Sequence, residues 1–211
     1  MIKIKAFIIG FLLHFLFITS VLTIGLAPPE QLLGYTQKIM YFHVASAVGC
    51  FFLLAVGVLV AVSKFFGVFP TGEKFCSAVI RLSFLLASFV LLSGMIWARY
   101  AWGAWFHFEP RLVSFLILWI FLLSANFFED YRRLSPLVCV FGFVLAGLAK
   151  YSIEFADPKF QLHPQVLAQG GLKHAMFEVA LYSTIAFVLF LSFKLLSLGL
   201  KVEALKDILK N

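Results

Sequence analysis

Long apolar stretches alternate with short polar ones along the whole chain. A helix needs about 20 apolar residues to cross roughly 30 Å of hydrocarbon, and six stretches come close to this length. They are residues 6–27, 39–62, 75–98, 112–128, 134–149 and 175–200. Prolines, glycines and charged clusters separate them. The pattern predicts an all-α fold, a six-helix integral membrane bundle that forms a single transmembrane domain over residues 1–211.

Composition supports a membrane protein and excludes several other classes. Apolar residues make up 63% of the chain and charged residues 13%, and the mean hydropathy is +1.02. A soluble domain of this length leaves about 30% of its unfolded surface exposed, and that surface must suit water. The same composition excludes a disordered tail, a disulfide-stapled secreted domain and an ordinary nucleic-acid binder.

The distribution of the 17 basic residues predicts the orientation of the bundle. With the N-terminus in the cytoplasm, eleven of them lie on the inner side and six on the outer side. The outer six are Lys38, Arg99, Arg111, Lys150, Lys159 and Lys173. The positive-inside rule then predicts that both termini are cytoplasmic. The net charge of +7 is therefore read as an orientation signal and a contact with anionic membrane lipid, not with nucleic acid.

Aromatic residues gather in one predicted outer loop, residues 97–111. Three of the four tryptophans, Trp97, Trp102 and Trp105, fall within nine positions there. If the loop is helical, Trp102, Trp105, Phe106 and Glu109 have the spacing i, i+3, i+4, i+7 and form one aromatic face. The alternative is an aromatic belt, because Trp and Tyr favour the membrane–water boundary.

Charged residues within this loop favour a ligand over a belt. His107, Glu109, Arg99 and Arg111 make the segment too polar for a membrane core. Aromatic rings stack on flat apolar ligands, and planar guanidinium groups bind carboxylates through two hydrogen bonds. Haem is flat, apolar and carries two carboxylates, so the loop predicts a haem site.

Histidines provide candidate axial ligands for haem iron. His43 lies about one turn into the second apolar stretch, and His163 lies in the last outer loop, so both can reach the level of the aromatic loop. His107 is a rival ligand, and His174 is a helix cap or a partner of a ligand. His14 lies in the inner half of the first stretch, where we expect it to pack. No Cys-x-x-Cys-His motif occurs, so covalent attachment of haem to this chain is not expected.

Other chemistry is not indicated by the sequence. There is no glycine-rich phosphate loop, serine-nucleophile motif or His-Glu-x-x-His motif, so no catalytic residue is predicted and a carrier is favoured over a stand-alone enzyme. Two alternatives stay open. One is a haem b-bearing membrane anchor subunit of a quinone-reacting enzyme, and the other is a small-solute permease with an aromatic belt.

The tryptophan loop and the two outer histidines resemble the cytochrome c assembly protein family, and within it the CcmC-type haem-handling membrane proteins. The family loop runs approximately Trp-Gly-x-Trp-Trp-x-Trp-Asp-x-Arg. Here it reads Trp102-Gly-Ala-Trp105-Phe106-His107-Phe108-Glu109-Pro110-Arg111. The segment Ile39-Met40-Tyr41-Phe42-His43-Val44 is similar to the family segment that carries the first outer histidine, and Leu162-His163 matches the second by placement.

The resemblance implies haem b held non-covalently at the outer face of the bacterial cytoplasmic (inner) membrane. The iron would lie between His43 and His163 as metal ligands. Trp102, Trp105, Phe106 and Phe108 would hold the ring, and Glu109 and Arg111 complete the set implied to bind the cofactor. It also implies that haem is delivered for cytochrome c maturation to a periplasmic haem chaperone, aided by a small membrane subunit and an ABC-type (ATP-binding-cassette) complex.

Overall fold

The computed structural model describes residues 2–29, 33–69, 71–127, 131–155 and 175–210. They form six α-helices and two short 3-10 helices, and no strand occurs in these ranges. The α-helices are α1 (Ile2–Leu26), α2 (Ile39–Phe65), α3 (Gly72–Trp102), α4 (Pro110–Phe127), α5 (Tyr131–Tyr151) and α6 (Ala175–Lys210); the 3-10 helices are η1 (Tyr35–Lys38) and η2 (Ser152–Glu154). All six α-helices are long and apolar enough to span a membrane. The predicted all-α, six-helix membrane fold is confirmed.

Several helices are longer than the apolar stretches that predicted them. Helix α3 has 31 residues and begins at Gly72 where the apolar pattern began at residue 75. At 1.5 Å per residue it is about 46 Å long, roughly 16 Å more than the hydrocarbon thickness. Its last turns, which contain Trp97 and Trp102, therefore extend to the boundary of the membrane or beyond it.

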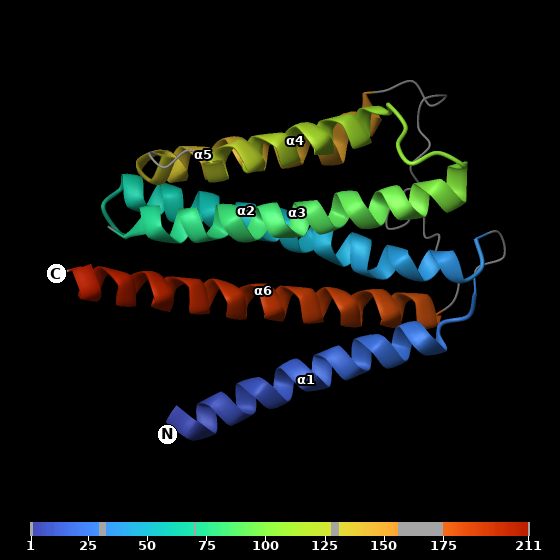
Figure 1. Cartoon of the computed structure of the whole chain (residues 1–211), viewed down its shortest axis with the longest axis horizontal. Helices are drawn as coiled ribbons and strands as arrows, with labels where there is room; N and C mark the ends of the chain where they lie inside the picture. Colours follow the sequence, from blue (N-terminus) through green and yellow to red (C-terminus); the bar gives the residue numbers. More distant parts are fainter. Residues whose placement is uncertain (1, 30–32, 70, 128–130, 156–174, 211) are drawn as a thin grey trace.

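The helices lie in layers around a central pair (Figure 1). Helices α2 and α3 pack along one another, α4 and α5 cover one side of them, and α6 followed by α1 covers the other. Both termini lie at one end of the bundle, which we call the termini end. The loop of residues 103–109, between α3 and α4, lies at the opposite end, which we call the aromatic end.

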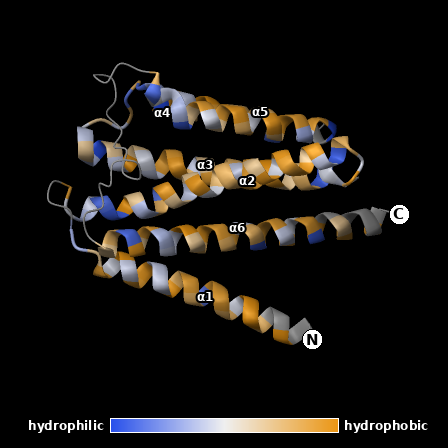
Figure 2. Cartoon of the chain, turned by 180° about the vertical axis from the view of Figure 1, so that it is seen from behind, coloured by the Kyte–Doolittle hydropathy of each residue, from blue (hydrophilic) through white to orange (hydrophobic). Residues whose placement is uncertain are grey.

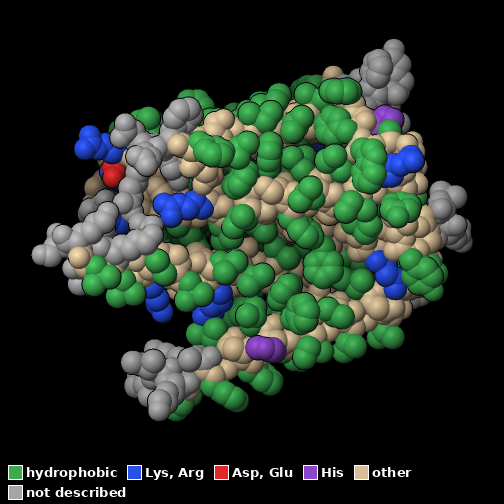
Figure 3. All heavy atoms as spheres, viewed as in Figure 1, with side chains coloured by type: hydrophobic (Ala, Val, Ile, Leu, Met, Phe, Trp, Pro, Cys, Tyr) green, Lys and Arg blue, Asp and Glu red, His purple; other side chains and the backbone are tan. Residues whose placement is uncertain are grey.

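Polarity follows this axis. Colouring by hydropathy shows apolar residues along the bodies of the helices and polar residues toward both ends (Figure 2). On the molecular surface, apolar side chains cover the middle of the bundle, and most Lys and Arg side chains lie toward its ends (Figure 3). This banding is the arrangement that a bilayer requires of a protein with several spans.

Small residues bring α5 close to α2 in the half nearer the termini end. A side chain at Gly57 of α2 would place its Cβ 2.7 Å from Cys139 Sγ of α5, and one at Gly142 of α5 would lie 3.2 Å from Leu54 of α2. Glycine at such positions lets two helix backbones approach closely. Because Leu54 and Cys139 are fully buried, this contact forms part of the main core.

We expect Gly57→Ala to destabilise the bundle. The added methyl group would meet Cys139 Sγ and, at 3.1 Å, Val79 Cγ1, and overpacking of this kind costs about 1–3 kcal/mol. Thermal unfolding in detergent should show a lower midpoint than the wild type. The matched control is Gly199→Ala on α6, where no atom lies within 4 Å. Equal midpoints for the two variants would contradict the close packing.

Helix α1 is joined to α6 by hydroxyl pairs. Ser20 Oγ lies 2.9 Å from Thr184 Oγ1, and Thr23 Oγ1 lies 2.9 Å from Ser183 Oγ. Both pairs are in the half of α1 nearer the aromatic end. Toward the termini end α1 diverges from α6 (Figure 1), and Phe7 on that half is exposed. Helix α1 is thus fastened mainly along one half of its length.

Candidate functional site

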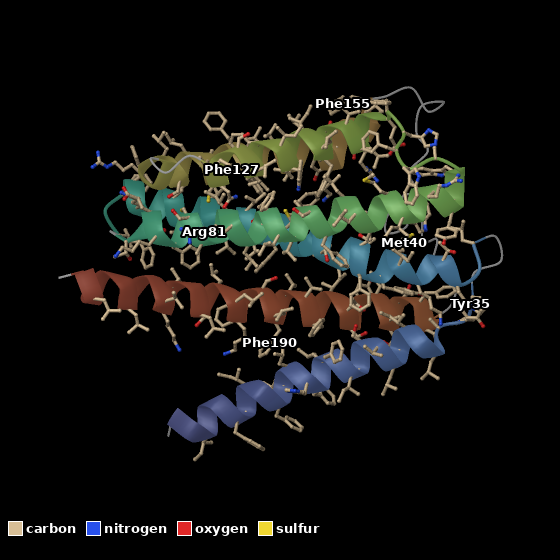
Figure 4. The ribbon with its side chains drawn as sticks, in the orientation of Figure 1. Tyr35, Met40, Arg81, Phe127, Phe155 and Phe190 are labelled. Atoms are coloured by element: carbon tan, nitrogen blue, oxygen red, sulfur yellow. The ribbon has the colours of Figure 1, made fainter. Side chains whose placement is uncertain are left out.

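A cavity of about 640 Å³ lies toward the aromatic end of the bundle. Its walls come from α2, α3, α4 and the last turn of α5, and its mouth from the loop of residues 103–109 and η2. Met40, which lines it, is labelled on α2 near this end (Figure 4). The close α2–α5 contact at Gly57 lies nearer the termini end, so the cavity lies between that contact and the aromatic end.

The deeper part of the cavity is apolar. Phe51 and Phe52 of α2, Leu91 of α3 and Phe115 of α4 line it. Cofactor pockets typically have volumes of about 300–1,000 Å³ and mostly hydrophobic walls with a few polar groups. The cavity therefore suits a flat, largely apolar molecule whose polar edge remains at the mouth.

His43 is the titratable group on the α2 wall. Its Nδ1 lies 3.1 Å from the carbonyl oxygen of Val90 and 3.2 Å from Ser93 Oγ, both on α3. Histidines that bind metals usually bond through their second nitrogen to a carbonyl or carboxylate, which fixes the ring. With Nδ1 occupied by α3, Nε2 is the nitrogen that would coordinate a metal.

Tryptophan and phenylalanine rings surround the mouth. Trp97 and Trp102 of α3 line the cavity and meet edge to face, with ring centroids 5.1 Å apart. Trp105 and Phe106 of the following loop line it as well, and Trp105 remains 55% exposed. Trp97 is only 7% exposed, and its indole N–H has no hydrogen-bond partner among the described residues. A buried donor of this kind fits a site completed by a ligand.

The predicted helical aromatic face is wrong beyond Trp102. Gly103 has φ 74° and caps α3 in the left-handed conformation, and the exposed Arg99 donates to its carbonyl oxygen. Pro110 then begins α4 as its first residue, where a missing N–H costs nothing. Residues 103–109 therefore form a loop between two helices, and the spacing i, i+3, i+4, i+7 does not apply to them.

This loop separates the predicted ligand-binding residues into two groups. The structure brings His43, Trp102, Trp105, Phe106 and Arg111 together around the cavity. Phe108 and Glu109 are not among the residues that line it.

Each of these two side chains has a different environment. Phe108 is 89% exposed and meets Phe106 edge to face at 5.4 Å. Glu109 is 3% exposed, and its carbonyl oxygen accepts from the backbone N–H of Val113 at 3.0 Å, in the first turn of α4.

Cationic groups lie at the mouth on the α4–α5 side. Arg111 Nη2 donates to the carbonyl oxygen of Lys150 at 3.3 Å, and both residues line the cavity together with Glu154. Arg111 also lies within the electrostatic reach of Glu109 and Glu154. The mouth thus combines two cations with carboxylates close to one of them.

The other histidines have different positions. His163 and His174 lie outside the described residues. His107 meets Trp102 edge to face at 5.4 Å but is not among the residues lining the cavity. His14 is exposed on α1 and bonds to the carbonyl oxygen of Gly10 in its own helix at 2.8 Å, so the expectation that it packs in the bundle is wrong.

The sequence did not reveal the contact with α3 that positions the His43 ring. It also did not reveal some of the residues that line the cavity. Gly94 of α3 lies against the His43 ring, and Glu154 lies at the mouth. A glycine within an apolar stretch signals a close approach of some kind, but it does not say what approaches. Lys150 was one of several outer cations, and its place at the mouth follows from where α5 ends.

Comparison with known proteins gives a consistent result. The family model described as Heme exporter protein C matches residues 2–208. The chain is similar to Heme exporter protein C of Paracoccus denitrificans (strain Pd 1222), with 29% identity over 184 residues, 81% of this chain and 75% of that protein. It is also similar to the protein of the same name from Escherichia coli (strain K12), with 26% identity over 141 residues, 62% of this chain and 56% of that protein. The family match includes every residue around the cavity and all of the six helices except the last two residues of α6, so the chain belongs to the heme exporter protein C family.

Proposed function

We propose that this chain binds haem in the cavity at the aromatic end and passes it on during cytochrome c maturation. The observation that carries the proposal is the convergence of an imidazole, several aromatic rings and a guanidinium group on one cavity of about 640 Å³. Membership of the family supports haem handling for cytochrome c maturation.

The side chains around the cavity have the chemistry that each part of haem requires. The imidazole of His43 would be one iron ligand. His163, which lies outside the described residues, would be the second. The faces and edges of Trp102, Trp105 and Phe106 contact the porphyrin ring. Arg111 and Lys150 at the mouth bind the propionates, Arg111 through a planar donor pair.

The orientation follows from the charge pattern. Both termini lie at one end of the bundle (Figure 1), and the excess of basic residues at that end supports a cytoplasmic position for it. The aromatic end then faces the outer side of the bacterial cytoplasmic membrane. Haem b bound non-covalently there is accessible to a periplasmic haem chaperone, and a small membrane subunit and an ATP-binding-cassette complex assist its release.

Transfer requires a site that holds haem only moderately. Trp105 is more than half exposed, so part of the aromatic wall is open to a partner. The carboxylates of Glu109 and Glu154 act on Arg111 and compete with a propionate for its charge. An open wall and a partly compensated cation both limit affinity, which suits a protein that must hand its ligand on.

The absorption spectrum of the purified protein tests the proposal. We expect protein extracted in detergent from haem-sufficient cells to show a Soret band of bis-histidine character. Pyridine extraction should release haem b, since the chain has no Cys-x-x-Cys-His motif for covalent attachment. A colourless protein that also fails to bind added haem would contradict the function.

Two further measurements address the alternatives. A haem-bearing anchor subunit of a quinone-reacting enzyme should be reduced and reoxidised by quinols, whereas a carrier needs no such cycle. A small-solute permease with an aromatic belt binds no haem, and it should tolerate Trp102→Leu and Trp105→Leu. We expect instead that the double variant retains less haem than the wild type.

A further inference from the structure

Gly94 exposes part of the backbone of α3 to His43. In an α-helix, a side chain covers the turn that precedes it, so the residue at i+4 shields the carbonyl group of residue i. Gly94 stands four residues after Val90 and has no side chain. The imidazole of His43, from α2, reaches the Val90 carbonyl oxygen at this point, with Nδ1 3.1 Å away.

The hydrogen bonds around this contact show which nitrogen of the His43 ring carries the proton. Ser93 has one hydroxyl hydrogen, and its shortest contact is 2.6 Å to the Phe89 carbonyl oxygen, with the Val90 carbonyl oxygen at 3.3 Å. Both α3 groups near Nδ1 therefore present oxygen lone pairs, the Val90 carbonyl at 3.1 Å and Ser93 Oγ at 3.2 Å. The proton of the contact must be on Nδ1. In a neutral imidazole this leaves the lone pair on Nε2.

The same contact fixes the position of the ring. A Cβ at residue 94 would lie 2.8 Å from His43 Cε1 and 3.3 Å from Nδ1. The first distance is shorter than real Cβ contacts allow, and the imidazole ring is rigid. A methyl group at residue 94 would therefore force the ring away from Val90 and Ser93.

We propose that Ser93 and Gly94 are the positioning residues for His43. Gly94 leaves the space for the ring, and Nδ1–H donates to Ser93 Oγ and to the Val90 carbonyl oxygen. These contacts hold the ring in the Nδ1–H tautomer, with Nε2 as the ligand atom, and the hydrogen bonds at Nδ1 increase the basicity of Nε2. The inference rests on the proposed haem function for its ligand, and it adds which residues set the geometry and the electron donation of the iron ligand. Changes to such hydrogen-bond partners typically lower metal affinity by about 10- to 100-fold.

Gly94→Ala tests whether the close contact with residue 94 fixes the position of the His43 ring. Titration of haem into the haem-free variant should show affinity at least about 100-fold weaker than the wild type, the upper end of the range for such partners. The control is Gly147→Ala on α5, which has no atom within 4 Å of its Cβ and should bind haem as the wild type does. Size-exclusion profiles and thermal unfolding of both variants show whether the bundle is intact.

Ser93→Ala tests the effect of the Nδ1 hydrogen bonds on the basicity of Nε2, and it adds no atom near the ring. The variant keeps the Val90 contact and loses one acceptor, so haem affinity should fall by about tenfold. The midpoint potential of the bound haem should rise, because a less basic Nε2 donates less charge and ferric iron is less stabilised. The control is Ser124→Ala on α4, whose hydroxyl bonds to Ile120 of its own helix at 2.8 Å. A purely structural role for Ser93 would leave the potential unchanged.

A measurement without haem separates this inference from the proposed function. Nitrogen NMR of protein labelled at histidine should show His43 as the Nδ1–H tautomer in the haem-free wild type, and His43→Gln identifies its signals. Gly94→Ala should change that tautomer balance. If His43 is protonated at Nε2, or if both variants keep wild-type affinity and potential, the inference is overturned even where the wild type binds haem. A wild type with the expected tautomer and no haem binding overturns the function alone.

Discussion

His43→Ala should abolish most haem binding. The substitution removes the imidazole on the α2 wall and leaves the aromatic rings and Arg111 in place around the cavity. We expect the apparent affinity to fall by more than the roughly 100-fold caused by altering a ligand's hydrogen-bond partners. Haem titration of the purified protein, followed at the Soret band, measures the change. Added imidazole should restore part of the spectrum, because the variant leaves space where the ring stood.

Two further variants complete this experiment. His14→Ala removes the exposed histidine of α1 and should bind haem as the wild type does. His43→Ala combined with His163→Ala should lose the remaining axial coordination and the bis-histidine spectrum. Unchanged haem content in the double variant would contradict the assignment of both ligands and would direct attention to His107, which lies beside Trp102.

Arg111→Gln should weaken haem binding by removing a cation at the mouth. A hydrogen bond to a charged group is worth about 1.5–3 kcal/mol, so the affinity should fall by about 10- to 100-fold. The dimethyl ester of haem separates this effect from any damage to the fold, because its propionates carry no charge. We expect the wild type and Arg111→Gln to bind the ester with similar affinity.

Arg99→Gln is the control for the arginine experiment. Arg99 is exposed and donates to the carbonyl oxygen of Gly103, and it is not among the residues that line the cavity. Its substitution should leave the affinity for haem within about twofold of the wild type, as expected for an exposed charge away from the ligand. Equal losses for haem and for the ester in Arg111→Gln would indicate that Arg111 acts by joining α4 to α5 instead of by binding a propionate.

The sequence predicted the helices better than it predicted their ends. Six apolar stretches of membrane-spanning length are a strong signal, and six such helices are present. The end of α3 was less clear, because aromatic residues continue past Trp102 at helical spacing. Gly103 and Pro110 were the local signals for a break, and they outweigh the spacing of the aromatic residues.

The candidate site was predictable where residue type alone indicates the chemistry. His43, Trp102, Trp105, Phe106 and Arg111 were named from the sequence and line one cavity. The placement of Phe108 and Glu109 depends on the path of the loop between the end of α3 at Gly103 and the start of α4 at Pro110. The position of the His43 ring depends on a contact between residues about 50 positions apart in the chain, and no local sequence pattern contains that information.

The attachment of α1 has a consequence for how the protein is made. Helix α1 is synthesised first, but α6, the helix it packs against most, is synthesised about 150 residues later. At 5–20 residues per second, α1 precedes α6 by roughly 7–30 seconds. Its apolar side chains, such as Phe7, Phe11 and Phe15, are exposed even in the finished bundle, so lipid is a suitable environment throughout. The hydroxyl pairs of Ser20 with Thr184 and of Thr23 with Ser183 can therefore form only after α6 has been synthesised.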